Sequence, residues 1–214
     1  MMPDLVGWVA SHGQLVARTA QEHVVLSATA LAIALMIAFP LGVALARRDA
    51  LAGPVLGIAN TLRTIPSLAL LVIMLPVLGT GFLPSIVALT LYGLPAVLLN
   101  TIVGLREVDR DIVEAARGQG LSEGQVLRRV TLPLALPVIL AGVRTAAVQI
   151  VSAATLAVFI GGGGLGELIS SGLGLMDMAQ LTTGALLVAL LAIGTELGLG
   201  SLQRSLARRS GAAA

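Results

Sequence analysis

The sequence predicts an all-α protein that crosses a membrane several times. Of its 214 residues, 57% are hydrophobic and only 11% are charged, whereas an ordinary soluble domain carries about a quarter charged residues. The apolar residues are gathered into uncharged stretches of about the 20 residues that a helix needs to cross the hydrocarbon layer. Composition and stretch length together predict one polytopic helical membrane domain over residues 1–214.

Five spans follow from the uncharged stretches. The first stretch is long enough for one crossing, but the apolar stretch from 64 to 105 is too long. A loop signal of glycines and a proline, Gly79–Pro84, divides it into two spans. The predicted spans are 24–46, 58–78, 82–105, 138–160 and 181–202.

Arginine placement predicts the orientation, because inner loops of membrane proteins are rich in basic residues. With the N-terminus outside and the C-terminus inside, the outer side holds only Arg18. Two further arginines, Arg63 and Arg144, are predicted about one helical turn inside the inner boundary, where their side chains reach the cytoplasmic surface. The remaining ten fall on the inner side: Arg47, Arg48, Arg106, Arg110, Arg117, Arg128, Arg129, Arg204, Arg208 and Arg209.

The N-terminal segment is not expected to be a cleavable signal peptide. Residues 1–17 hold no basic charge, and the pair Arg47–Arg48 follows the first apolar run instead of preceding it. Segment 3–19 carries apolar residues at helical spacing together with Trp8. A short helix at the outer interface, anchored by the indole, and a plain polar lead-in both fit these residues.

Segment 106–133, between the third and fourth spans, is the polar part of the inner side. It holds five arginines and five of the eleven acidic residues. Asp109 or Asp111 is a suitable N-cap for a first short helix, and Gly120 is a suitable end for it. The interpretation as an ordinary solvated loop and the interpretation as a docking element for another protein both remain open at this point.

A second short helix is predicted directly after the first. Ser122, with Gln125 three residues later, has the spacing of a capping box. Pro133 and Pro137 are expected to end this helix and to open the fourth span, because proline cannot continue the hydrogen-bond ladder of a helix. The segment is therefore predicted to form two short capped helices separated by a turn.

Residue types that are absent exclude several kinds of chemistry. The chain contains no cysteine and no lysine. It therefore has no disulfide, no thiolate metal site, no Schiff-base lysine and no Walker A lysine for ATP. His12 and His23 have no further ligands nearby in the sequence, so no metal site is predicted. The few ionisable residues in the spans also do not form a catalytic cluster, and we expect no enzyme and no bound cofactor.

One motif in the polar segment resembles a known signature. Glu114-Ala115-Ala116, then Gly120, Val130 and Leu132-Pro133 resemble the EAA signature of bacterial ABC importer permeases, with valine in place of isoleucine. The resemblance implies a type I permease core of five transmembrane helices in the bacterial cytoplasmic membrane. It also implies that this loop docks onto a separate ATPase subunit, which binds ATP and magnesium. The residues that it assigns to this coupling are Glu114, Ala115, Ala116 and Gly120, and the adjacent Leu121 is included with them. Charge alone adds Arg117, Arg128 and Arg129 as partners for acidic residues of the ATPase.

A wider pattern resembles the osmoprotectant branch of these permeases, which import glycine betaine, choline or carnitine. It comprises Thr64–Leu70, Leu132–Val138, Ala141–Ala146 and Ala154–Gly166. The resemblance implies an extracytoplasmic binding protein and a second permease, a copy or a homologue, that completes a dimeric pore; it implies no nucleic acid. Importers of other small solutes such as amino acids, and a membrane scaffold without transport, are the open alternatives.

Polar residues inside the spans are candidates for the translocation pathway, because they are costly in lipid. Glu196 either pairs with Arg63 or Arg144, or leaves an arginine beside the path to meet a solute carboxylate. Pro66 and Ser67 are candidates for a gate, and Asn100 adds polarity to the third span. The glycine-rich loop 161–179 is expected to form a flexible re-entrant turn that a binding protein touches at its edge.

Overall fold

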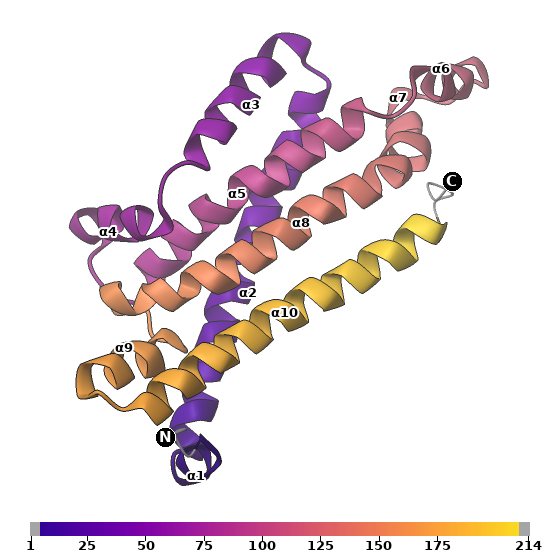
Figure 1. The fold of residues 1–214 in the computed structure, drawn as a ribbon. Coiled ribbons are helices and arrows are strands. Elements are labelled where there is room, and N and C mark those ends of the chain that lie inside the picture. Colours follow the sequence, from indigo (N-terminus) through magenta and orange to yellow (C-terminus); the bar gives the residue numbers. More distant parts are fainter. Residues whose placement is uncertain (1–4, 210–214) are drawn as a thin grey trace.

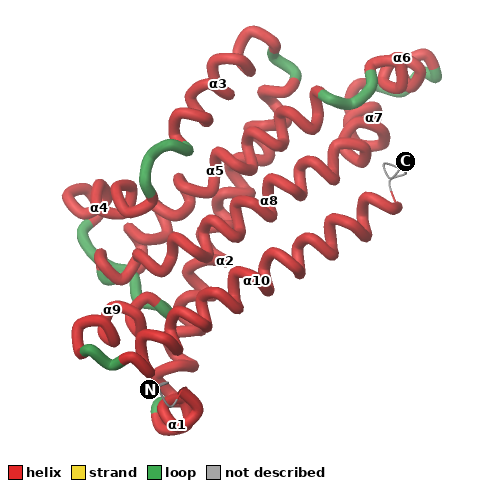
Figure 2. The backbone as a smooth tube through the Cα atoms, viewed as in Figure 1, coloured by secondary structure: helices red, strands yellow, loops and turns green. Residues whose placement is uncertain are grey.

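The computed structural model describes residues 5–209, apart from the side chains of residues 49 and 207–209. Throughout the described range the backbone forms helices joined by loops, with no strand (Figure 2). This confirms the predicted all-α class. Pro3, the first residue of the predicted lead-in, and the side chains of Arg208 and Arg209 lie outside what is described.

Four helical segments are long and apolar enough to cross a membrane, and a bent helix pair brings the number to five in the described range. The four are α2 (Gly13–Ala46), α5 (Phe82–Arg106), the continuous segment Glu123–Ile160 that contains α8 (Leu132–Ala154), and α10 (Met178–Arg209). In Figure 1, α5, α8 and α10 run along one another at a slant, and α2 passes more steeply behind them. α5 nearly coincides with the predicted span 82–105, whereas α2 and α10 are longer than predicted because their helices continue past the apolar stretch.

The predicted second span, 58–78, is not one helix. α3 (Asp49–Leu62) and α4 (Ser67–Leu78) meet at an angle of 93°. Pro66 causes the break, because it lacks an N–H and disfavours helical geometry in the residue before it; its φ of −59° and ψ of 137° are non-helical. Arg63 consequently caps the far end of α3, about 21 Å along the helix from Asp49. Its place about one turn inside the inner boundary of the membrane stays a prediction.

The fourth span also begins differently from the prediction. α7 (Glu123–Val126) continues through a π-helical turn, η1 (Leu127–Thr131), directly into α8. Pro133 lies in the first turn of α8, and Pro137 lies within the helix. The two prolines therefore do not end the preceding helix. The wider π turn comes immediately before Pro133 and leaves room at the point where a proline ring would crowd the preceding turn of an α-helix.

α5 is central to the bundle because glycines let α2 and α8 approach it closely. A Cβ added at Gly42 of α2 would lie 2.7 Å from Cβ of Thr101, and one added at Gly93 of α5 would lie 2.5 Å from Cδ1 of Ile150. A Cβ at Gly142 of α8 would collide with Asn100 and would lie 2.7 Å from the carbonyl oxygen of Ala96. Such contacts between small residues are how membrane helices gain packing energy.

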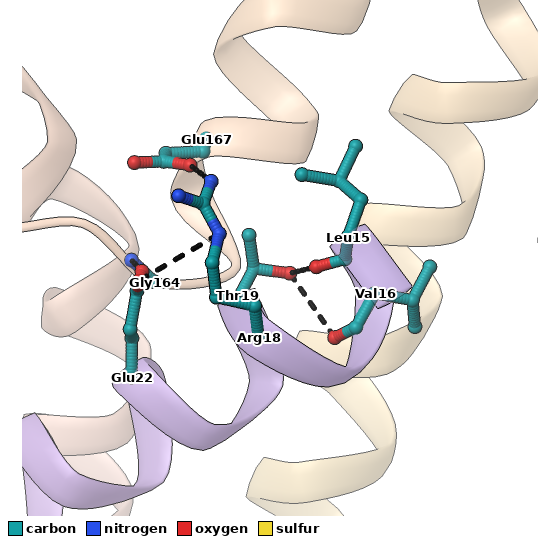
Figure 3. A network of polar contacts seen from close by, with 7 residues as sticks. All are labelled: Leu15, Val16, Arg18, Thr19, Glu22, Gly164 and Glu167. Carbon is teal, nitrogen blue, oxygen red and sulfur yellow. Dashed lines mark hydrogen bonds and ion pairs between the residues drawn. The ribbon is translucent and has the colours of Figure 1, made fainter. Parts of the chain in front are cut away.

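The outer loop is more ordered than the predicted flexible turn. Most of segment 161–179 forms α9 (Gly166–Leu175), which follows a short 3₁₀ helix, η2 (Thr155–Ile160). Figure 3 shows Arg18 of α2 pointing to Glu167 of α9, with 2.8 Å between Nη2 and Oε2. The backbone N–H of Gly164 donates to the Glu22 carboxylate at 3.1 Å. The loop is thus held against the start of α2.

The N-terminal residues form two helices instead of one. α1 (Leu5–Ser11) ends before His12, and α2 begins at Gly13. The indole N–H of Trp8 donates to Asp177 at 3.2 Å, so α1 is tied to the turn that precedes α10. Figure 1 places α1 and α9 at one end of the bundle, and α6 (Arg110–Gly118), α7 and the α2–α3 junction at the other.

The close contact at Gly142 predicts a stability effect. Gly142→Ala should lower the free energy of unfolding by about 1–3 kcal/mol, because the added methyl group overpacks the α5–α8 contact. Gly57→Ala in α3 is the matched control: no atom lies within 4 Å of the added Cβ, and alanine favours helix by up to about 1 kcal/mol. Denaturation of the purified chain in detergent measures both. Equal stabilities would contradict the packing argument.

Candidate coupling loop and membrane-embedded polar residues

The segment between α5 and α8 forms two short helices with defined ends. Asp109 caps α6 and accepts a hydrogen bond from the N–H of Asp111 at 2.8 Å. At the other end, the N–H of Leu121 donates to Ala116 and the N–H of Gly120 donates to Arg117. This is the Schellman pattern, and Gly120 has the positive φ, 83°, that the pattern requires.

α7 is joined to α6 by side chains as well as by the turn. Ser122 and Gln125 form a capping box, in which the N–H of Ser122 donates to Oε1 of Gln125 at 2.9 Å. Arg117 of α6 donates two hydrogen bonds to Glu123 of α7, at 2.8 and 3.3 Å. The hydrogen bond and charge of Glu123 raise the pKa of the Arg117 guanidinium above its ordinary value. The pair is solvent-exposed, so its contribution lies more in fixing the angle between the helices than in stability.

The predicted coupling residues fall on two sides of this helix pair. Glu114, Ala115 and Gly120 are exposed, and Leu121 is half-buried. Ala116 is only 8% exposed. Its side chain is therefore buried within this chain, whereas its place in the docking element stays a prediction.

A polar cavity of about 530 Å³ separates the helix pair from the ends of α2 and α5. Arg47 crosses part of this space, with 3.5 Å between its Nη2 and the carbonyl oxygen of Glu123. Figure 1 shows α6 projecting beyond the end of the bundle. The exposed side of α6 is therefore available to another protein.

Two of the three ionisable residues predicted in the spans pair with each other. Nε of Arg144 on α8 lies 3.3 Å from Oε1 of Glu196 on α10. Gly200 leaves room for this arginine, because a Cβ there would lie 3.2 Å from its Nη1. Of the two pairings considered for Glu196, the structure contains the one with Arg144. Arg63 lies elsewhere, exposed at the α3–α4 break.

The other predicted pathway residues do not gather around this pair. Asn100 donates to the Ala96 carbonyl at 2.8 Å and lies in the α5–α8 contact. Pro66 and Ser67 form the start of α4. The prediction also did not single out Thr145, Gln149 and Ser152 of α8, although their spacing of four and three residues is visible in the sequence.

The two histidines have contacts within the fold. His12 stacks on Trp8, with 4.4 Å between the ring centroids. His23 is buried, and its Nε2 lies 3.0 Å from the carbonyl oxygen of Val151. In a continued α-helix, the backbone N–H of Thr155 would donate to this carbonyl. Because the 3₁₀ segment begins here, it donates instead to the carbonyl oxygens of Ser152 and Ala153. His23 thus occupies the acceptor that the change of helix type leaves free.

The Arg144–Glu196 pair predicts non-additive mutational effects. Arg144→Met or Glu196→Met should each lower the yield of folded protein, because each leaves one charge without its partner in a membrane span. The double variant should recover most of the loss. Thermal unfolding and membrane yield are measured for the unmodified chain, the two single variants and the double variant, which together form a double-mutant cycle. If the loss in the double variant equals the sum of the two single losses, the pair is not coupled.

Comparison with known proteins places this arrangement in a family. The family model described as "Binding-protein-dependent transport system inner membrane component" matches residues 37–211. The choline transport system permease protein OpuBB of Bacillus subtilis is 40% identical over 205 residues, which are 96% of this chain and 94% of that protein. The osmoprotectant import permease protein OsmW of Salmonella typhimurium is 40% identical over 205 residues, with 94% and 95% covered.

A solved structure shows the same fold. The chain is similar to an inward-facing structure of the MetNI methionine ABC transporter, with a TM-score of 0.80, 24% identity, and coverage of 96% of this chain and 99% of that chain. The match extends over the bundle and the projecting loop alike. The chain therefore belongs to the family of binding-protein-dependent transport system inner membrane components, the membrane-spanning permease subunits of ABC importers.

Proposed function

We propose that this chain is the permease of an importer for quaternary ammonium osmoprotectants such as glycine betaine, choline or carnitine. One observation carries the proposal: permeases named for choline, carnitine and osmoprotectant transport are 38–40% identical to it over at least 94% of its length. Because these alignments cover at least 94% of the chain, they include both the spans and the loops.

The projecting helix pair is the proposed connection to the ATPase. Glu114, Ala115 and the Gly120–Leu121 turn form its outer side, and Arg117 holds α7 at a fixed angle. α7 continues through η1 into α8, so a displacement of the pair by the ATPase would reach the membrane span directly. The chain lacks the lysine of a P-loop, and ATP with magnesium binds on the ATPase subunit.

A second permease, a copy or a homologue, completes the proposed pore. The proposed orientation has the N-terminus outside and the C-terminus inside. It is supported by the arginine-rich junctions and the helix pair, which share one end of the bundle (Figure 1). The opposite end, with α1 and α9, then faces the solute-binding protein. Closure of the ATPases on ATP would move the coupling loops and open the cavity outward.

Solute selection is assigned to the binding protein. Quaternary ammonium groups are commonly held in aromatic cages. Aromatic residues make up 2% of this chain, which is too few for such a cage. We therefore expect the permease to discriminate weakly among solutes that its binding protein delivers.

Uptake measurements test the proposed solute class. The chain is expressed with its ATPase and binding protein in a bacterial strain that lacks osmoprotectant uptake. Labelled betaine, choline or carnitine should accumulate in an ATP-dependent manner, whereas proline and methionine should not. Uptake of methionine or proline without any quaternary ammonium solute would overturn the solute class and leave the importer assignment in place.

The left-handed backbone at Gly120 predicts a coupling defect. Gly120→Ala should weaken co-purification with the ATPase and reduce uptake, because alanine costs about 1 kcal/mol in this conformation and loosens the turn. Gly118→Ala, two residues earlier, is the matched control, since it lies within α6 and no atom is within 4 Å of the added Cβ. Full binding and uptake by Gly120→Ala would argue against this turn as the docking element.

A further inference from the structure

One face of α8 carries polar side chains where a lipid-facing helix would carry apolar ones. Thr145, Gln149 and Ser152 follow one another at spacings of four and three residues, which places them in one row along the helix. Thr145 and Ser152 are exposed, and Gln149 is half-buried. Gln149 is also the central residue of the predicted span 138–160. The row therefore lies at the depth of the hydrocarbon layer.

The fold sets the direction in which this row faces. Gly142, which precedes Gln149 by seven residues, contacts α5. Arg144 reaches α10, and the buried residues Ala147 and Val151 lie toward α2. The row therefore lies on the part of the α8 surface between its contact with α5 and its contact with α10. In Figure 1, α8 lies between α5 and α10, and α2 passes behind it.

Two of the three side chains have no partner within the described part of the chain. Thr145 donates to the carbonyl of Ala141 at 2.9 Å, as threonines in membrane helices commonly do. The amide of Gln149 and the hydroxyl of Ser152 make no hydrogen bond among the described residues. Lipid tails offer no hydrogen bonds, so polar groups at this depth face protein or a water-filled cavity.

Exposed residues on α2 form a useful contrast. Within the predicted span 24–46, the large exposed side chains of α2 are apolar: Val24, Val25, Met36, Ile37 and Leu41. That composition suits contact with lipid. The polar row of Thr145, Gln149 and Ser152 on α8 does not suit contact with lipid.

We infer that Thr145, Gln149 and Ser152 line the translocation path of the assembled importer. The inference rests on the proposed function for the nature of the solute. The Gln149 amide oxygen and the hydroxyl oxygens present partial negative charge to a trimethylammonium group, and the amide N–H and hydroxyls can donate to a solute carboxylate. The protein groups carry no formal charge, so they hold the solute less strongly than an ion pair would, as a path that must release its solute requires. Glu196 neutralises Arg144 on the neighbouring face, so the arginine does not repel a cationic solute.

The absence of native cysteine makes the inference directly testable. Thr145→Cys, Gln149→Cys and Ser152→Cys are placed one at a time in the complete importer in membrane vesicles. Each is treated with a methanethiosulfonate reagent that carries a trimethylammonium group. Met36→Cys, at an α2 position that is 68% exposed, is the control for a lipid-facing thiol.

The three α8 cysteines should react at least about tenfold faster than Cys at position 36, because thiolates form in water and not in lipid. Their rates should change between the nucleotide-free and the ATP-trapped importer, since the path opens to opposite sides. Rates equal to that of the control, in an importer that still transports, would overturn the inference.

A second pair of variants covers the case in which a cysteine variant does not assemble. Gln149→Leu and Ser152→Ala remove the polar groups and suit a lipid-facing helix. Uptake at low solute concentration should fall about tenfold in Gln149→Leu, the loss expected for one hydrogen bond to a charged group, with co-purification of the ATPase unchanged. Unchanged uptake in both variants would also overturn the inference. If the α8 cysteines react fast but no quaternary ammonium solute is taken up, the inferred path stands and only the proposed solute class is rejected.

Discussion

Every polar group within the hydrocarbon layer needs a partner, because lipid offers none. This constraint explains why the described spans are helices, whose backbone groups are satisfied within each segment. It also explains the contacts that the ionisable side chains make. Arg144 and Glu196 meet across the α8–α10 contact, and His23 occupies the carbonyl that the change from α8 to η2 leaves free. Where a polar group has no internal partner, as on the exposed face of α8, the constraint itself becomes evidence for water or another subunit.

The two ends of the bundle differ in how they are built. At one end, α1, α9 and the start of α2 are joined by Trp8–Asp177 and Arg18–Glu167. At the other, the α6–α7 pair is fixed internally by a Schellman turn, a capping box and the Arg117–Glu123 pair, but a cavity separates it from the bundle. A unit that is rigid in itself and attached through a continuous helix can transmit a displacement. This is the physical requirement for a coupling element in a transporter whose motor is a separate protein.

Prediction from the sequence was accurate where local signals act alone. Asp109, Gly120 and the Ser122–Gln125 pair mark helix ends because each interaction is completed within a few residues. The expectation that Pro133 would end the preceding helix was wrong. Pro66 breaks a span by 93°, whereas a π turn carries the chain past Pro133. Hydropathy averages over such details, so it did not show that Arg63 lies at the break between α3 and α4.

The sequence by itself determined that this is a helical membrane protein, which residues form the capped helix pair, and which family the chain resembles. These properties follow from composition, from short-range caps and from a motif of fixed spacing. Only the tertiary structure decided that Glu196 meets Arg144 and that Ala116 is buried. It also decided that the side chains of Gln149 and Ser152 make no hydrogen bond within the described part of the chain. The positions of Arg144, Gln149 and Ser152 depend on how α8 is rotated about its axis between α5 and α10, and contacts such as Gly142 against Asn100 set that rotation. A rotation of a helix about its axis leaves its hydropathy unchanged, so no one-dimensional pattern specifies it.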